Sequence, residues 1–141
     1  MTTTFKLKPV RKYMGTIITP VTVSNSTNAE KHVTFDGFVD TGATFLTLPS
    51  AWREKLGDLE KVEDVEMEMA SGEMRPGEVW GPARIKIDGF REIFGEVLFM
   101  DMEPDADGNY EPLIGYLPLE AIPAGVDMLN HRLFKAKVRA K

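Results

Sequence analysis

Short segments in which apolar and polar residues alternate recur along the chain, and they restrict it to a β-rich fold. In residues 62–70 apolar residues alternate with glutamates, and residues 83–88 alternate in the same way. Each segment runs into a glycine-containing turn, Ser71-Gly72 and Asp88-Gly89, which is typical of a β-hairpin. Short strands with few helix signals predict an all-β domain, either a barrel or a sandwich.

Other segments are predicted as strands because they are rich in β-branched or apolar residues. They cover residues 13–23, 31–39, 93–100 and 133–138. One short helix is predicted over 51–56, where Ser50 can cap the first N–H groups and Gly57 can end the helix in a left-handed turn. A second short helix is predicted over 118–122. Residues 24–30 and 101–111 are expected to be loops.

Length and composition exclude several classes of function. We expect the 141 residues (1–141) to form one domain. The chain has no cysteine, which excludes disulfides and thiol nucleophiles, and its net charge of -5 argues against a nucleic-acid partner. The N-terminus lacks the apolar core of a signal peptide, and no apolar stretch approaches the roughly 18 residues of a membrane span. We therefore expect a cytoplasmic protein with no membrane association.

The tripeptide Asp40-Thr41-Gly42 is the strongest candidate for a chemical site. It follows the apolar pair Phe38-Val39 at the end of a predicted strand. An aspartate in an apolar loop is costly to ionise, so its carboxyl needs partners or a raised pKa. The Thr41 hydroxyl can fix a tight loop, and Gly42 lets another backbone or a ligand approach closely. Alone, such a tripeptide is weak evidence, because it arises by chance in many chains.

The surrounding sequence strengthens this interpretation. Residues 38–44 resemble the active-site loop of the retropepsin-like aspartic proteases. The segment Ala70-Ser71-Gly72-Glu73, at a predicted hairpin tip, resembles the flap of that family. The segment Leu113-Ile114-Gly115 resembles its hydrophobic-hydrophobic-glycine signature. The resemblance is strongest to small, stand-alone prokaryotic members and covers about residues 13–138, which would form the core of the domain. It implies a closed acid-protease barrel with one or two short helices.

The resemblance also implies a mechanism and a set of site residues. Asp40 would be catalytic, within an active-site loop that includes Thr41, Gly42, Ala43 and Thr44. The family hydrolyses peptide bonds with a water held between two aspartates, and no other aspartate of this chain precedes Thr-Gly or Ser-Gly. The second Asp40 would therefore come from a second copy in a homodimer. The flap, residues 70–73, would contact the main chain of a peptide substrate, and no metal or cofactor is expected.

Three other interpretations compete with an aspartic endopeptidase. The chain could be a non-catalytic peptide- or protein-binding module that keeps the fold, although intact Asp40, Thr41 and Gly42 argue against a decayed site. It could be a metal-assisted hydrolase with clustered acids, which chelators would inhibit. The acidic segment 103–111 superficially resembles a calcium loop, but the position that requires glutamate would be Ile114.

Overall fold

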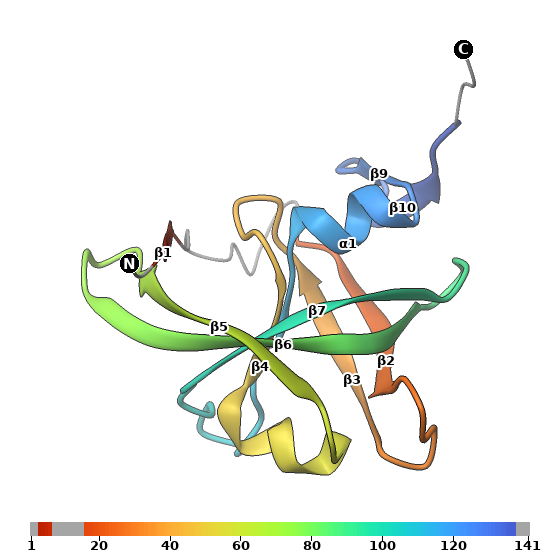
Figure 1. Cartoon of the computed structure of the whole chain (residues 1–141). Helices are drawn as coiled ribbons and strands as arrows, with labels where there is room; N and C mark the ends of the chain where they lie inside the picture. The colour runs from red at the N-terminus through yellow and green to blue at the C-terminus, as the bar shows by residue number, and fades with distance from the viewer. Residues whose placement is uncertain (1–2, 7–15, 138–141) are drawn as a thin grey trace.

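The computed structural model describes residues 3–6 and 16–137, which form ten strands and two short helices (Figure 1). Eight strands belong to one sheet: β1 (Thr3–Lys6), β2 (Ile18–Asn25), β3 (His32–Val39), β4 (Leu46–Pro49), β5 (Glu60–Glu68), β6 (Met74–Ile87), β7 (Ile93–Met100) and β8 (Leu113–Ile114). The remaining elements are the helices η1 (Ser50–Leu56) and α1 (Tyr116–Ala121) and the strands β9 (Ala124–Asp127) and β10 (Arg132–Lys135).

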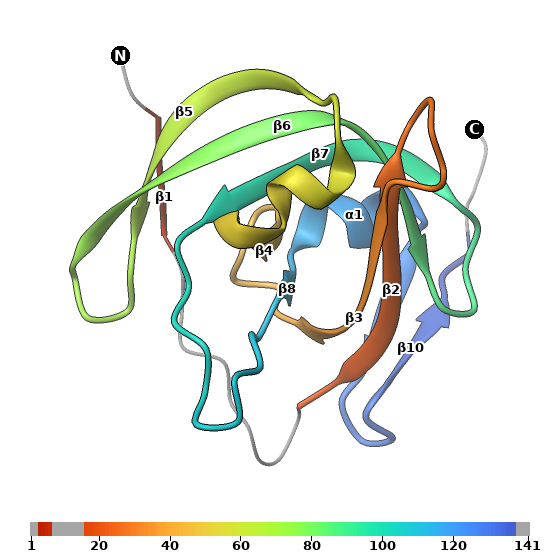
Figure 2. The same ribbon diagram turned by 90° about the horizontal axis from the view of Figure 1, so that it is seen from below.

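The sheet closes on itself as a barrel. Its strand order is β1-β5-β6-β2-β3-β8-β4-β7, and an additional pairing joins β7 back to β6. The ring therefore contains β6, β2, β3, β8, β4 and β7, while β5 and β1 extend from it. This closed barrel confirms the all-β prediction and excludes a sandwich. Figure 2 shows β5 and β6 as a long curved hairpin that arches over β7.

Inward-facing side chains form two apolar clusters. The larger one fills the barrel and includes fully buried residues of β2 and β6, such as Val23 and Ile87. The second lies under the β5–β6 hairpin, and we call its buried members the flap-side cluster: Ala43, Phe45, Val65, Met67, Val79, Leu98, Met100 and Leu113. Phe5 of β1 packs against it. Burying a large aliphatic or aromatic side chain contributes about 1.5–3 kcal/mol, so the clusters hold the hairpin over the barrel.

Most predicted elements are present with shifted ends. The strand predicted over 93–100 is β7, and the one predicted over 31–39 is β3 without its first residue. The helix predicted over 51–56 is a 3-10 helix that begins at Ser50. The proposed capping role of Ser50 is wrong, because Pro49 occupies the cap position and no side chain caps the helix. Gly57 has the positive φ expected of it, 67°, but its ψ of -135° lies outside the left-handed helical region, so the predicted left-handed turn is not formed.

The strand β6 is much longer than the sequence suggested. Only residues 83–88 of it were predicted as a strand, and β6 also contains Pro76-Gly77 and Gly81-Pro82. The strand runs through both pairs because neighbouring strands pair with nearly all of it: β5 from Met74 to Gly81, and β7 or β2 from Ala83 to Ile87. A register shift against β7 between Trp80 and Ala83 accommodates the second proline.

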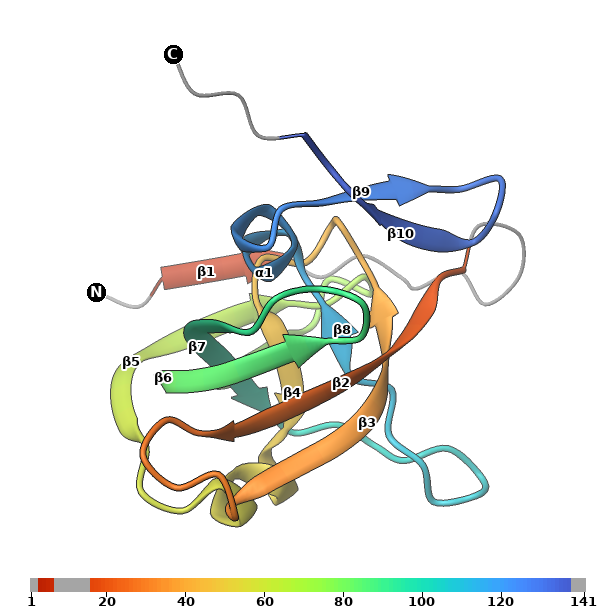
Figure 3. The same cartoon turned by 90° about the vertical axis from the view of Figure 1, so that its right-hand side faces the viewer.

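The C-terminal part departs most from the expected pattern. The helix predicted over 118–122 begins two residues earlier, at Tyr116. The final strand is Arg132–Lys135, and it pairs with β9, which was not expected. Residue 138 lies outside the described residues. Figure 3 shows the β9–β10 hairpin beside α1 and apart from the barrel. Among the described residues, none of the helices is both long and apolar enough for a membrane span.

Candidate active site

Asp40 lies immediately after β3, where this strand pairs with the parallel strand β8. Its backbone N–H donates to the carbonyl of Ile114 at 3.0 Å, and that of Val39 donates to Ile17 at 2.9 Å. Gly37 permits this contact, because a β-carbon there would lie 2.8 Å from the Ile114 side chain. The start of the loop 40–45 is therefore fixed by β8 on one side and by Ile17, just before β2, on the other.

The loop itself is a tight turn around the Asp40 carboxyl group. Oδ1 of Asp40 accepts a hydrogen bond from the Gly42 N–H at 2.9 Å, and its carbonyl accepts one from the Ala43 N–H at 3.0 Å. Oδ2 is buried. Thr41 is exposed, Gly42 and Thr44 are half-buried, and Ala43 is fully buried. The carboxyl group is thus held in one orientation by the loop that follows it.

The first turn of α1 fixes the other end of the loop. The backbone N–H groups of Tyr116 and Leu117 each donate at 3.0 Å, to Ala43 and Thr44 respectively, and that of Gly115 donates to Phe45 at 3.1 Å. The first N–H groups of a helix have no partner within the helix. Here the loop carbonyls accept them, so the segment 113–115 and the loop 40–45 form one hydrogen-bonded unit.

The predicted flap, Ala70 to Glu73, is the tip of the β5–β6 hairpin. The Met69 and Gly72 N–H groups donate at 2.8 Å to Glu73 and Met69, and Gly72 has a φ of 87°. Residues 70–73 are exposed. The strand that leads to the tip connects the flap with the loop, since Val65 and Met67 belong to the same cluster as Ala43 and Phe45.

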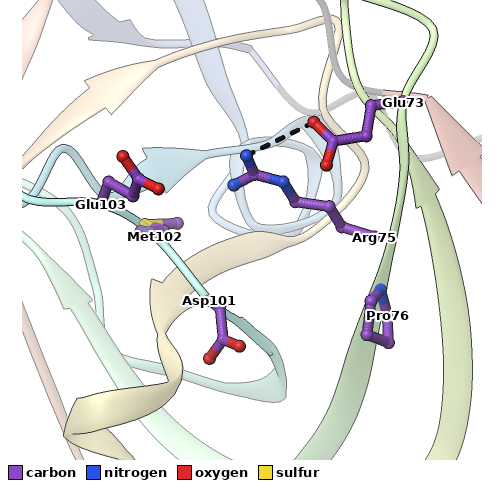
Figure 4. A pocket seen from close by; sticks show the side chains of 6 residues that line it. All are labelled: Glu73, Arg75, Pro76, Asp101, Met102 and Glu103. Carbon is purple, nitrogen blue, oxygen red and sulfur yellow. Dashed lines mark hydrogen bonds and ion pairs between the residues drawn. The ribbon is translucent and has the colours of Figure 1, made fainter.

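A shallow pocket of about 280 Å³ lies at the base of the flap. It is lined by Glu73, Arg75, Pro76, Asp101, Met102 and Glu103. Figure 4 shows the Arg75 side chain extending from β6 to an ion pair with Glu73, at 3.5 Å. Met102 also packs against the flap-side cluster. No residue of the loop 40–45 lines this pocket, so the pocket is not itself the candidate active site.

In the acidic segment 103–111, the carboxylate of Asp105 accepts hydrogen bonds from the backbone of the same segment. Asp105 Oδ1 accepts the N–H groups of Asp107 and Asn109, both at 2.9 Å. These bonds stabilise a turn, which explains why an aspartate occupies position 105 without invoking a calcium ion. Within residues 3–6 and 16–137, no group of three or more histidine and acidic side chains is arranged to hold a metal ion.

Sequence reasoning missed two parts of this site. One is β1, which pairs with β5 and carries Phe5 into the flap-side cluster. The run Thr3-Thr4-Phe5 has strand-forming residues, so its composition was a usable signal. The other is the support from α1, which depends on backbone N–H groups at Tyr116 and Leu117. Almost every residue type has a backbone N–H group, so the sequence cannot indicate which of these groups bond to the loop.

Comparisons with known proteins agree with this arrangement. A family model described as aspartyl protease matches residues 19–116, more than half of the chain. Among solved structures, the chain is similar to the EIAV protease in complex with the inhibitor HBY-793. The TM-score is 0.57 at 19% sequence identity, over 86% of this chain and 99% of that one, which is evidence of a shared fold. A search among curated proteins found no match.

Proposed function

Because the chain belongs to the aspartyl protease family, we propose that it is an aspartic endopeptidase completed by a second copy of itself. In this proposal residues 1–141 are one protease domain, and each copy supplies one Asp40. The observation that carries the proposal is the place of the Asp40 carboxyl: Oδ2 is buried at the end of β3, in a loop whose backbone is bonded to Ile114 of β8 and to the first turn of α1. Asp105 makes the same kind of bond to the N–H two residues on, but it lies exposed in a surface turn.

A homodimer follows from the number of catalytic groups. The chemistry needs two carboxyl groups, and the sequence contains a single Asp-Thr-Gly. A twofold axis between two copies would bring the two Asp40 side chains together. Thr41 is exposed beside the carboxyl, which supports a role for its hydroxyl in a hydrogen bond across the dimer.

The proposed reaction is hydrolysis of a peptide bond by an activated water. One Asp40 carboxylate takes a proton from the water as general base, and the water oxygen attacks the scissile carbonyl carbon. The other Asp40, protonated, donates its proton to the carbonyl oxygen. The resulting tetrahedral intermediate then collapses. The first Asp40, which now holds the water's proton, gives it to the leaving nitrogen as the C–N bond breaks, and the second Asp40 takes a proton back from a hydroxyl of the intermediate. No metal ion or cofactor takes part in these steps.

Electrostatics explain why a symmetric pair would act as an acid and a base. Two carboxylates about 4 Å apart repel by about 4 kcal/mol at an effective dielectric constant of about 20. The second proton therefore leaves the pair at a higher pH than the first, and between the two steps the dimer holds one shared proton. Shared-proton aspartates of this protease class are a known example of the effect.

The surface around the loop is suited to pairing with a second copy. Tyr116 and Leu117, which hydrogen-bond to the loop, have exposed side chains. The nearby hairpin β9–β10 adds Leu129, which is 91% exposed, together with Met128 and Phe134. Large exposed apolar side chains are candidates for an interaction surface. We propose that these side chains of α1 and the β9–β10 hairpin form the dimer interface.

The main alternative is a binding module that keeps the fold and cleaves nothing. It would hold an extended peptide between the flap and the loop 40–45 without turnover. In that case substitution of Asp40 would leave peptide binding and all other properties nearly unchanged. The buried carboxylate oxygen of Asp40 favours the enzyme, because burying an acidic group is costly and a binding module gains nothing from it here.

The test is cleavage of a diverse peptide mixture, read by mass spectrometry between about pH 4 and 8. The protein is used at a concentration where sedimentation detects a dimer. We expect cleavage by the wild type and none by Asp40→Asn. Asp36→Asn is the control, since Asp36 is exposed on the same strand, and it should cleave normally. Cleavage that survives in Asp40→Asn, or its absence in a dimeric wild type, would contradict the proposal.

A further inference from the structure

The strand β1 lies along the free edge of the flap strand β5. The two strands are parallel, with Thr3 opposite Val65 and Lys6 opposite Glu68. The other edge of β5 is occupied by β6. The paired stretch ends one residue before Met69, where the flap turn begins. Figures 1 and 2 both show β1 beside the flap end of β5.

Phe5 connects this strand to the active-site loop. Its ring meets the ring of Phe45 edge-on, with centroids 4.9 Å apart and planes at 74°. Phe45 follows Thr44, the last residue of the predicted loop motif. Met67 lies opposite Phe5 on β5 and belongs to the same cluster as Phe45. One side chain of β1 is therefore packed where the flap strand and the active-site loop meet.

The barrel does not depend on β1 for closure. The ring of six strands is complete without it, and β1 contributes only four residues at the edge of the sheet. Thr3 and Thr4 are exposed, and Phe5 is half-buried. So short an edge strand is held weakly. When it leaves, β5 presents unpaired N–H and C=O groups, to which any extended peptide can add as a strand.

We propose that β1 occupies the place of a substrate peptide and acts as an internal competitor for it. The inference rests on the proposed function, in which flap and active-site loop face the substrate. Phe5 then marks a subsite, bordered by Phe45 and Met67, that takes an aromatic or large apolar side chain. The substrates would be extended peptides with such a residue, and the flexible side chains of Met67 and Met69 let the subsite adapt to its shape.

Competition by β1 has a measurable consequence. A peptide binds only the fraction of molecules in which β1 has left, so its apparent affinity is reduced by that fraction. Locking β1 in place should abolish peptide binding, and weakening its hold should improve binding. Both changes can be made in the full chain.

The lock is a disulfide between Thr4→Cys and Glu66→Cys. These residues are paired in register, on the face opposite to Phe5 and Met67. Adjacent strands lie about 4.8 Å apart, within the range that a disulfide spans. The chain has no cysteine, so the two new thiols can pair only with each other within one molecule. Thr4→Cys alone is the control.

The probe is a fluorescein-labelled peptide with the sequence of residues 2–8, measured by fluorescence anisotropy in the Asp40→Asn background, where it is not cleaved. We expect the oxidised double variant to bind at least about tenfold more weakly than its reduced form, a loss that dithiothreitol reverses. Phe5→Ala should bind the probe more tightly than the parent chain. A probe with alanine in place of its phenylalanine should bind at least about tenfold more weakly.

Equal binding by the oxidised and reduced forms would overturn the inference, and so would failure of the thiols to pair, because β1 would then not lie where β5 places it. The inference and the proposed function fail separately. If binding depends on the redox state but the chain with Asp40 cleaves no peptide, the proposed protease activity is wrong and competition by β1 is supported. If the chain with Asp40 cleaves peptides at the same rate in both redox states, the protease activity is supported and competition by β1 is wrong.

Discussion

Gly115 lies so close to Phe45 that a β-carbon on the glycine would fall 2.5 Å from the Phe45 carbonyl oxygen. The same β-carbon would lie 2.6 Å from the carbonyl carbon of Thr44. Both atoms belong to backbone that hydrogen-bonds to the first turn of α1, so they cannot move as a flexible side chain would. The glycine is what allows the helix and the active-site loop to share one set of hydrogen bonds.

Gly115→Ala should therefore displace the loop. We expect a loss of about 1–3 kcal/mol in the free energy of unfolding, as for other overpacked sites. Peptide cleavage should fall further than stability alone explains, because Asp40 follows the backbone. Urea unfolding and cleavage rates of the folded protein measure the two effects. Gly95→Ala is the control, since its β-carbon would meet only the Ile85 methyl group at 3.2 Å. An active, stable Gly115→Ala would contradict the assignment.

The flap turn offers a test of its role in catalysis. Gly72 has a φ of 87°, and no atom of residues 3–6 or 16–137 lies within 4 Å of the place where a β-carbon would be. Gly72→Ala adds only backbone strain, about 1–2 kcal/mol. We expect kcat/KM for peptides to fall roughly tenfold, since about 1.4 kcal/mol is a factor of ten. Gly89→Ala carries the same strain at a turn with a φ of 86° and equally open space. Gly89→Ala should leave cleavage unchanged. An equal loss of kcat/KM in both variants would contradict a role of the flap turn in catalysis.

The proposed dimer surface can be tested at Leu129. Burial of a leucine side chain contributes about 1.5–3 kcal/mol, so Leu129→Glu should weaken dimerisation by at least about tenfold. Sedimentation equilibrium measures the change, and cleavage should fall in parallel at low protein concentration. The control is Val62→Glu, because Val62 is 55% exposed on β5 and lies outside this surface. An unchanged dimer in Leu129→Glu would place the interface elsewhere.

The turn of the same hairpin should depend on pH. Hydrogen bonds from the Asn130 side chain and backbone hold the pKa of Asp127 below its ordinary value, with smaller contributions from the Leu129 N–H and Arg132. The lowered pKa means that the charged carboxylate stabilises the folded turn. This stabilisation is present above the ordinary pKa of an aspartate and is lost as the pH falls through the lowered one.

We therefore expect hydrogen-exchange protection of the Leu129 and Asn130 amides to decrease at acid pH, after correction for the intrinsic exchange rate. Both amides donate to Asp127 Oδ1 at 3.2 Å. In Asp127→Asn, which keeps an acceptor and has no charge to lose, protection should not change over the same pH interval. Protection that is independent of pH in the wild type would show that the carboxylate does not hold the turn.

Local sequence patterns predicted the parts of the fold that depend on residues close together in the chain. The strand β7 ends in four apolar residues that are all buried, and it was predicted with both boundaries, Ile93 and Met100. The loop at Asp40 was predicted because residues 38–44, with the segments 70–73 and 113–115, resemble the motifs of a known family, whereas the tripeptide alone was weak evidence. These signals lie within a few residues of the chain.

The remaining features depend on contacts between distant segments. Pro76 sits within β6 because β5 and β7 hold the strand around it. Gly125 is tolerated in β9 because the ring of Phe134 on β10 covers it. The pairing of β1 with β5 joins residues about sixty positions apart. No local window contains both partners, so periodicity could not predict them.

The central claim, that two copies of the chain each supply one Asp40, is tested most directly by mixing subunits. Wild-type and Asp40→Asn chains are combined at equal concentration, allowed to exchange, and assayed for peptide cleavage. If both carboxyl groups are required, only dimers of two wild-type chains are active, about a quarter of the total. The wild-type protein should then lose about half of its activity on mixing. Full retention of wild-type activity would show that one Asp40 is sufficient and would contradict the dimeric active site.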